Sequence, residues 1–375
     1  MKAVITNVDM ITPYGRGAEL CMEGLLSGDS AISNVSRFNT ESFNSHRAGF
    51  CPGLDPELPE SLVWQMLEPM LNSMASSAPD DSTVITATTA GEIDLLEKSV
   101  INGSRKADDS RPDKLLSSVC RAAEIHGDGM VISAACASST TALARAASLI
   151  QRGKAESVLV AACDSVSEFV FSGFSALMAL DPEQASPFDR NRRGLTPGEA
   201  AGLVLLMSEE RARRENRRIL CELAGWGMTN DANHMTGPSR DGQALASAIT
   251  AAMDGAGAAP DTIDAICAHG TGTVYNDAME MKAFDLVFDS IPVPAFSVKG
   301  AIGHTMGAAG LIETVISIKS LEKKCVPPTI GTQAIDDDAA LRIRKEVLPL
   351  NEPKTVLSTN SGFGGVNAAL LIRKG

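Results

Sequence analysis

The stretch Ser157-Val158-Leu159-Val160-Ala161-Ala162 decides the fold class, because it is apolar on both alternating faces of a strand. A strand with one face in water alternates apolar and polar residues, so this strand is expected to be covered on both sides. Residues 203–207 have the same character. Such strands belong to sheets with helices on both faces, and the sequence therefore predicts a layered α/β protein.

The same alternation of strands and helices continues along the chain. Further strand candidates are residues 3–11, 83–86, 130–133, 219–226, 265–268, 293–297, 356–358 and 368–372, and helical candidates are residues 137–152, 243–256, 277–288 and 308–323. A charged helical stretch, residues 209–218, separates two parts of similar content, and residues 52–80 and 102–114 are expected to form loops or peripheral helices. We expect duplicated α/β halves: residues 1–217, which carry the nucleophile described below, and residues 218–375, which carry the two histidines described below.

Composition and charge exclude several classes of protein. The 375 residues are 44% hydrophobic and 21% charged, which is typical of a globular protein with a sizeable core. The formal net charge is −13, which disfavours a general nucleic-acid or anionic-membrane binder. The first residues turn polar too soon for a signal peptide, and no apolar run reaches spanning length. We therefore expect a cytoplasmic protein without nucleic-acid or membrane partners.

The eight cysteines are scattered and include no CxxC pair. This spacing fits neither a disulfide framework nor a zinc ribbon, so no metal is expected and most cysteines are predicted to be small core residues. Cys136 is different, because it lies in Val131-Ile132-Ser133-Ala134-Ala135-Cys136-Ala137-Ser138-Ser139-Thr140. There a strand turns into a helix through small residues, as at a nucleophile elbow, and a helix N-terminus favours a thiolate. A buried core cysteine is the alternative interpretation.

Three glycine-rich turns follow predicted strands. His269 lies in the turn at residues 268–273 and His304 in the turn at residues 299–310, as expected for site residues at the carboxyl ends of strands. The second turn lacks the order of a phosphate loop, since Lys299 precedes its glycines. The third turn, residues 360–367, presents backbone N–H groups that suit an oxyanion site as well as a tight hairpin.

Together these four segments resemble the β-ketoacyl-acyl carrier protein synthases, the elongating, decarboxylating ketosynthases of fatty-acid and polyketide assembly. The similarity extends to residues 7–15, 28–32, 186–189, 198–202 and 327–329. It implies the thiolase fold, with duplicated halves in an α-β-α-β-α arrangement of layers. It also implies a decarboxylative Claisen condensation between an acyl group on the enzyme and malonyl carried by acyl carrier protein.

The resemblance assigns roles to residues of this chain. Cys136 matches the acyl-accepting cysteine, and His269 and His304 match the two histidines of the triad. The resemblance also implies supporting charged groups: Lys299 paired with Glu313, which would orient the His304 turn, and Asp277 and Glu280. It implies Phe363 as the oxyanion and gate residue. Thr271 and Thr273 would bind the phosphopantetheine arm. The backbone N–H of Cys136 is the second oxyanion donor.

The chemistry of the reaction agrees with these assignments. Thioester exchange needs a thiolate, and decarboxylation of malonyl needs hydrogen-bond donors for the enolate oxygen. Two neutral imidazoles donating N–H groups from opposite turns meet that need. No cofactor is expected on the enzyme itself, because phosphopantetheine of the carrier protein brings the substrates.

The chain also departs from the family pattern. A basic carrier-docking helix is usual at residues 57–69, but this segment contains no Lys or Arg. The Pro-rich segment expected between residues 100 and 130 is mostly missing. Ser361 stands where the family commonly has phenylalanine. These features favour a specialised enzyme over a housekeeping one. Arg192 and Arg193 are predicted to contribute to carrier docking, or a partner subunit supplies the basic surface, in a homodimer or in a heterodimer with a related ketosynthase-like subunit.

Two alternatives from other functional classes stay open at this point. One is a non-condensing partner subunit of a ketosynthase heterodimer. The other is an acyltransferase or hydrolase that uses the same acyl-cysteine. Carbon dioxide release from malonyl separates all three, because only the ketosynthase couples it to elongation.

Overall fold

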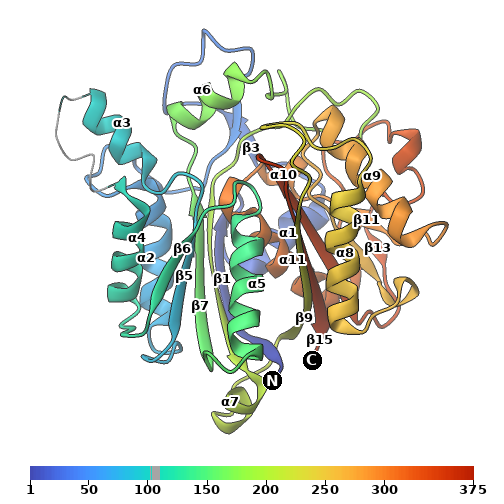
Figure 1. Ribbon diagram of the computed structural model, residues 1–375. Helices are drawn as coiled ribbons and strands as arrows, with labels where there is room; N and C mark the ends of the chain where they lie inside the picture. Colours follow the sequence, from blue (N-terminus) through green and yellow to red (C-terminus); the bar gives the residue numbers. More distant parts are fainter. Residues whose placement is uncertain (102, 104–109) are drawn as a thin grey trace.

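The computed structural model describes residues 1–101, 103 and 110–375, and a large mixed sheet runs through its centre (Figure 1). Among these residues the strand order is β11-β10-β14-β15-β9-β1-β8-β7-β5-β6. The first five strands in chain order are β1 (Ala3–Thr12), β5 (Thr83–Ala87), β6 (Gly129–Ile132), β7 (Ser157–Asp164) and β8 (Ala200–Ser208). The other five are β9 (Cys221–Asn230), β10 (Ala265–Cys267), β11 (Ala295–Phe296), β14 (Thr355–Gly362) and β15 (Val366–Lys374).

The two sets of strands repeat one topology. In the first set, β5 pairs in parallel with β6 and β7, β7 is antiparallel to β8, and β8 is antiparallel to β1. In the second, β10 pairs in parallel with β11 and β14, β14 is antiparallel to β15, and β15 is antiparallel to β9. The sets meet where β1 and β9 pair at Val4 with Glu222 and Ile5 with Cys221. The predicted duplication is therefore present, and we propose residues 217 and 218, between β8 and β9, as its boundary.

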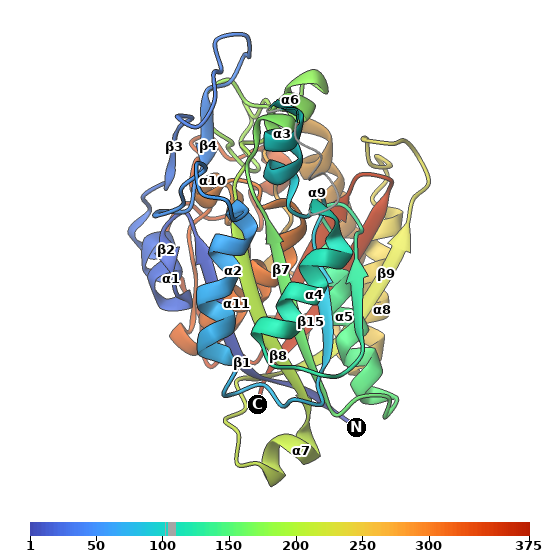
Figure 2. The same ribbon diagram turned by 90° about the vertical axis from the view of Figure 1, so that its left-hand side faces the viewer.

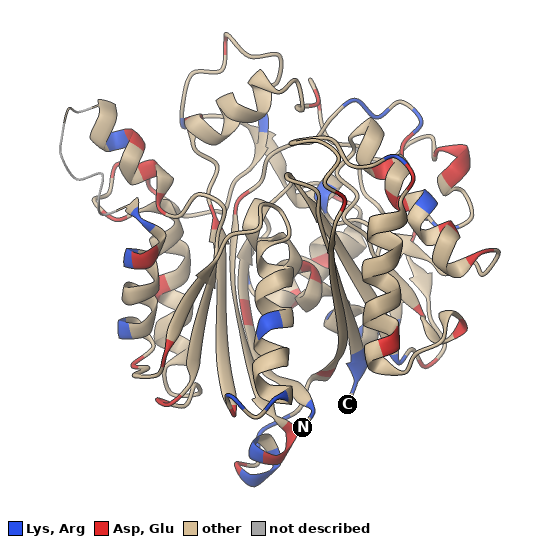
Figure 3. Cartoon of the chain, viewed as in Figure 1, with Lys and Arg blue, Asp and Glu red and all other residues tan. Residues whose placement is uncertain are grey.

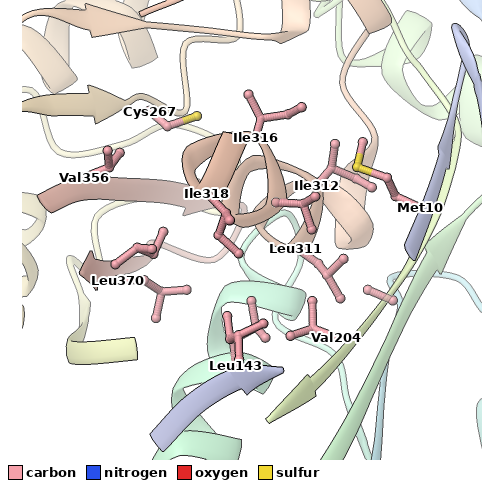
Figure 4. Packing of buried hydrophobic residues seen from close by; sticks show 14 of the residues in the cluster. Met10, Leu143, Val204, Cys267, Leu311, Ile312, Ile316, Ile318, Val356 and Leu370 are labelled. Atoms are coloured by element: carbon pink, nitrogen blue, oxygen red, sulfur yellow. The ribbon is translucent and has the colours of Figure 1, made fainter. Parts of the chain in front are cut away.

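Helices separate and cover the two parts of the sheet. The central helices α5 (Ser138–Gln151) and α11 (Ala309–Lys323) pack against each other and against strands of both sets. In this central layer Leu143, Leu311 and Ile312 meet Val204 of β8 and Leu370 of β15 (Figure 4). This apolar core fixes the two sets of strands around the two helices.

The outer helices complete the layers. Helices α2 (Leu62–Met74) and α4 (Pro112–Ala122) cover the first set of strands, in the half that faces the viewer in Figure 2. Helices α8 (Gln243–Ala256) and α9 (Val274–Phe288) lie on the far side of the second set. The predicted α-β-α-β-α order is confirmed by this arrangement.

Smaller elements connect these layers. They are β2 (Gly15–Arg16), α1 (Ala18–Ser27), β3 (Ile32–Asn34), β4 (Arg47–Gly49), α3 (Ile93–Ile101), α6 (Glu168–Ala176), α7 (Glu209–Arg214), α10 (Lys299–Ile302), β12 (Cys325–Val326) and β13 (Leu348–Pro349), with 3-10 turns at Pro260–Thr262, Met306–Ala308 and Asp337–Ala339. Within the described part of the chain, no helix combines the length and apolarity needed to cross a bilayer.

Two expectations from the sequence need correction. The charged helix predicted over residues 209–218 ends at Arg214, because Asn216 takes a left-handed backbone conformation with φ 53°. Residues 52–80 are more than peripheral, since Met66, Leu67 and Met70 of α2 are fully buried in the core. In the second expected loop region, residues 102 and 104–109 lie outside the described residues, and α4 begins at Pro112.

Candidate active site

Cys136 lies in a tight elbow between β6 and α5. Ala135 has a left-handed backbone with φ 48°, which is uncommon for a residue other than glycine. The Ser138 hydroxyl accepts the N–H of Ala134 at 2.8 Å and donates to the carbonyl of Ala135 at 2.6 Å. A Cβ atom on Gly362 would lie 3.1 Å from the Cys136 nitrogen, so glycine allows the third glycine-rich turn to approach the elbow. Cys136 is 7% exposed at the base of a pocket.

The two predicted histidines converge on this cysteine. His269 follows β10 and His304 follows α10, and both are buried. One ligand atom from each of Cys136, His269 and His304 lies within 4.8 Å of the others. The imidazole centroids are 5.2 Å apart, with the rings nearly perpendicular at 86°. His269 and His304 lie 133 and 168 positions after Cys136 in the chain, and the three residues form one cluster, as the sequence predicted.

Hydrogen bonds fix the protonation pattern of both imidazoles. The Asn360 side-chain amide lies 3.2 Å from His269 Nδ1, and the backbone N–H of Met306 donates to His304 Nδ1 at 3.3 Å. A ring nitrogen that accepts a hydrogen bond carries no proton, so each neutral ring carries its proton on Nε2. Metal-bound histidines usually donate their second N–H to an acceptor, which is the opposite pattern. The cluster is therefore built to donate hydrogen bonds.

Lys299 and Glu313 form a buried ion pair beside the histidines. The Lys299 ammonium contacts a carboxylate oxygen of Glu313 and donates to the His269 carbonyl at 2.5 Å. The expectation that this pair orients the His304 turn is therefore incomplete, because its direct contacts lie on the His269 side. The connection to His304 runs through the chain, since Lys299 begins α10 and His304 follows the end of that helix.

Asp277 and Glu280 accept hydrogen bonds from the backbone of the His269 turn. Glu280 accepts the backbone N–H groups of His269 at 2.7 Å and Gly270 at 2.6 Å. Asp277 accepts that of Thr271 at 3.1 Å and also binds the turn at Gly272. Both carboxylates project from the first turns of α9, so they satisfy a loop whose N–H groups would otherwise be buried without partners.

Burial controls the ionisation of the site. It raises the pKa of the Cys136 thiol to about 12, with Lys299 acting in the opposite direction and Asp164 adding to the rise. Burial and the Lys299 ammonium lower the pKa of both His269 and His304 well below the usual range. The helix terminus was expected to favour a thiolate, whereas burial raises the pKa, so the two effects act in opposite directions on the resting sulfur. The prediction of two neutral imidazoles agrees with the lowered values.

This ionisation predicts the pH dependence of cysteine alkylation. In the free protein, alkylation of Cys136 by iodoacetamide should rise about tenfold for each pH unit up to pH 10, without a plateau, because only the thiolate reacts. Mass spectrometry of the Cys136 peptide measures this rate, and the half-buried Cys120 in the same digest is the internal reference. A plateau near pH 7 would contradict the raised pKa.

The third glycine-rich turn reaches the cysteine. The backbone N–H groups of Phe363 and of Cys136 itself both favour the ionised sulfur, so both face the atom at which an acyl group would be attached. The Phe363 ring packs against Phe174 of α6, with centroids 6.2 Å apart. Ser361 also lines the pocket, and its hydroxyl donates to Asn367 at 2.7 Å. The two expected oxyanion donors are thus brought together.

A pocket of about 660 Å³ leads from this cluster to the surface. Its walls include Thr271 and Thr273, whose hydroxyls are 2.9 Å apart. The exposed side chains of Leu177, Met178 and Tyr275 form part of its outer lining. The pocket is therefore partly apolar, and it gives a substrate arm access to a cysteine that is itself buried.

The two arginines expected to bind a carrier protein lie in different environments. The Arg192 side chain is 8% exposed, contacts the Asp336 carboxylate and donates to the Asp189 carbonyl at 2.8 Å. Arg193 is 52% exposed, lines the pocket and lies 3.3 Å from Asp181. Arg192 thus forms an ion pair within the chain, with Asp336, and its contribution to carrier docking stays a prediction.

Three further polar residues in the site were not identified from the sequence. Asn360 and Thr140, both buried, contact the His269 side of the cluster. Asp164 accepts the backbone N–H of Gly307 at 2.6 Å and so holds the turn after His304. One signal was available for Asp164, since it ends the apolar strand β7 at its carboxyl end. Nothing local marks Thr140, which lies within an ordinary helical pattern.

Comparison with known proteins identifies the family. The N-terminal domain of β-ketoacyl synthase matches residues 63–212 and the C-terminal domain matches residues 220–333. The 3-oxoacyl-[acyl-carrier-protein] synthase 2 of Vibrio harveyi is 30% identical over 408 residues, covering 100% of this chain and 98% of that protein. That of Rhizobium meliloti is 30% identical over 416 residues, covering 100% and 99%.

Solved structures agree with the sequence matches. A type II polyketide ketosynthase, in complex with its acyl-carrier protein and bound to a hexaketide, has a TM-score of 0.90 at 27% identity, covering 100% of this chain and 99% of that one. A ketosynthase of Xenorhabdus doucetiae in complex with its chain length factor has a TM-score of 0.86 at 26% identity, covering 100% and 98%. The predicted thiolase fold is thereby confirmed. The chain belongs to the β-ketoacyl synthase family, the condensing acyltransferases of the thiolase superfamily.

Proposed function

We propose that the chain catalyses decarboxylative condensation of an acyl group held on Cys136 with malonyl carried by acyl carrier protein. The observation that carries the proposal is the convergence of Cys136 with two histidines that both present Nε2–H groups. A nucleophile beside two neutral donors suits a reaction that first forms a thioester and then develops an oxyanion.

In the first half-reaction Cys136 receives the acyl group. The sulfur attacks the acyl thioester carbonyl, the bond to the pantetheine sulfur breaks, and the cysteine proton ends on the departing thiol. The backbone N–H groups of Cys136 and Phe363 stabilise the tetrahedral oxyanion. Because the resting residue is a thiol, the proton leaves during attack and not before it.

In the second half-reaction malonyl loses carbon dioxide. The bond to its carboxylate carbon breaks, and the electron pair forms an enolate whose oxygen accepts hydrogen bonds from His269 Nε2 and His304 Nε2. The enolate carbon then attacks the acyl-Cys136 carbonyl, and the expelled thiolate takes up one proton from solvent. The lowered pKa of both rings supports this role, since they stay neutral donors across the physiological range.

Phosphopantetheine of the carrier protein is the group that brings both substrates. Thr271 and Thr273 line the pocket, and their hydroxyls suit the amide groups of the pantetheine arm. A solved relative is in complex with its acyl-carrier protein, which supports the same partner here. We place the enzyme in the cytoplasm, in a specialised fatty-acid or type II polyketide-like pathway.

Measurement of carbon dioxide release tests the proposal against its alternatives. With acyl and malonyl carrier protein, the wild type should release carbon dioxide in step with elongated product. Loss of acyl thioester alone would identify a hydrolase or acyltransferase. No turnover with the chain alone, and turnover after a ketosynthase-like subunit is added, would favour a heterodimer, as in relatives solved with a chain length factor.

Carrier docking gives a prediction for Arg193. Arg193→Glu should raise the KM for acyl carrier protein about 3- to 10-fold and leave turnover of a small thioester mimic unchanged, because an exposed rim charge acts on the encounter with an acidic partner. Arg213→Glu is the matched control, since Arg213 is 69% exposed on α7, at the opposite end of the molecule from α6 (Figure 1). In the same view, Figure 3 shows basic and acidic residues side by side on α7.

Arg192 should respond differently from Arg193. Arg192→Glu breaks a partly buried ion pair and should lower the free energy of unfolding by about 1–3 kcal/mol. Equal loss with the carrier protein and with the mimic for Arg193→Glu would remove Arg193 from the docking surface.

A further inference from the structure

Asn360 lies between His269 on one side and Glu313 and Thr140 on the other. It is fully buried at the carboxyl end of β14, and its side chain contacts three others. The amide nitrogen lies 2.8 Å from Glu313 Oε2 and 3.2 Å from His269 Nδ1. The amide oxygen accepts a hydrogen bond from the Thr140 hydroxyl at 2.5 Å. Both amide hydrogens and the oxygen therefore have partners.

The surroundings determine which way the amide points. Burial raises the pKa of Glu313, but the ion pair with Lys299 and the hydrogen bond from Asn360 both favour its carboxylate form, in which the second oxygen only accepts hydrogen bonds. A reversed amide would place its oxygen against that carboxylate and would leave the nitrogen facing Thr140. Glu313 and Thr140 thus select the orientation in which Asn360 donates to His269, and a donor at Nδ1 forces the imidazole proton onto Nε2.

Close packing leaves this contact little freedom. Thr140 lies one turn beyond Cys136 on α5, and Gly310 of α11 faces it. A Cβ atom on Gly310 would lie 1.8 Å from the Thr140 hydroxyl oxygen and 2.7 Å from the Asn360 amide oxygen. The helix that follows the nucleophile, α5, is therefore joined to His269 through Thr140 and Asn360.

We propose that Asn360 is a positioning residue that fixes His269 as the Nε2–H tautomer and so makes it a hydrogen-bond donor to the enolate. The inference rests on the proposed condensing function, but its central statement concerns the tautomer, which is measured without turnover. His304 is fixed separately, by the backbone N–H of Met306, so only one of the two donors depends on Asn360.

The test is a reversal of polarity at one atom. Asn360→Asp keeps the shape of the side chain. The introduced carboxyl group shares one proton with the adjacent Glu313 carboxylate, so the oxygen that faces His269 can only accept a hydrogen bond and the His269 proton must move to Nδ1. Nitrogen-15 NMR of labelled histidine, with the His269 signal identified by its loss in His269→Ala, should show the unprotonated nitrogen at Nδ1 in the wild type and at Nε2 in the variant. Malonyl decarboxylation should fall about 100-fold. Acylation of Cys136 should change less than threefold.

A control separates positioning from general destabilisation. Thr314→Val removes a fully buried hydroxyl that donates to the Gly310 carbonyl at 2.7 Å, next to Glu313 in sequence. It should lower the melting temperature while leaving the His269 tautomer and decarboxylation unchanged. Asn360→Ala should give both tautomers and a smaller loss than Asn360→Asp, although it removes more of the side chain.

Several outcomes would overturn the inference. One is a wild-type His269 protonated on Nδ1, which is decisive even if Asn360→Asp does not fold. Another is a folded Asn360→Asp variant with the wild-type tautomer or with decarboxylation within twofold of the wild type. A wild type that does not decarboxylate malonyl would instead contradict the proposed function, and the NMR result would still decide the tautomer.

Discussion

Replacing Cys136 by alanine is expected to abolish condensation and acyl loading while the protein stays folded. The reason is chemical, because no other described cysteine combines an open pocket with backbone donors facing its sulfur. The substitution removes one sulfur from a site that already adjoins the pocket, so the loss of stability should be about 1 kcal/mol or less. Mass spectrometry after incubation with acyl carrier protein measures the loading.

The other cysteines supply the control for this experiment. Cys120 is the half-buried one, whereas Cys163 and Cys325 are buried away from the pocket. Acyl transfer selected by exposure would label Cys120, and transfer selected by the site would label Cys136. Label on Cys163 or Cys325, or loading that survives in Cys136→Ala, would remove the proposed nucleophile.

The fold was predictable where local pattern alone determines structure. The strands at residues 157–164 and 200–208 are buried along their full length, and their unbroken apolar sequence indicated this before any coordinates. The order of the strands was not predictable in the same way. Pairing of β1 with β8 and of β15 with β9 joins segments far apart in the chain, and no local pattern encodes that register.

In the site, too, local sequence pattern predicted some features, and long-range packing decided the others. Both His269 and His304 were predicted in glycine-rich turns that follow strands, and the family resemblance predicted their convergence with Cys136. The local prediction needs correction for His304, which follows the short helix α10. The role of Asn360 was not, because it depends on Thr140, 220 positions away, and on Glu313. The raised pKa of Cys136 was not predicted for a related reason, since the depth of burial is a property of the packed molecule.

Charge on a surface segment was the least predictable property. Arg192 and Arg193 are neighbours in a basic turn, yet one is buried against Asp336 and the other is half exposed. Asp336 lies 144 positions further along the chain. A run of arginines in the sequence therefore indicates a docking surface only after its ion-pair partners are known.

Removal of either histidine is expected to separate the two half-reactions. His269→Ala and His304→Ala each delete one Nε2–H donor to the developing enolate, and each should slow malonyl decarboxylation about 10²- to 10³-fold. Acylation of Cys136 should be reduced much less, because its oxyanion is stabilised by the backbone N–H groups of Cys136 and Phe363. Release of labelled carbon dioxide and loading of Cys136 are measured on the same preparations.

The two histidine variants also test each other, because the rings differ in what fixes them. His304 accepts a backbone N–H, which no side-chain substitution removes, whereas His269 depends on Asn360. In Asn360→Asp, His269 should no longer act as a donor, so adding His269→Ala to that variant should cause little further loss. Adding His304→Ala should cause a large one. Equal further losses from both additions would mean that His269 still donates to the enolate, and decarboxylation unchanged in His269→Ala alone would exclude this histidine from the reaction.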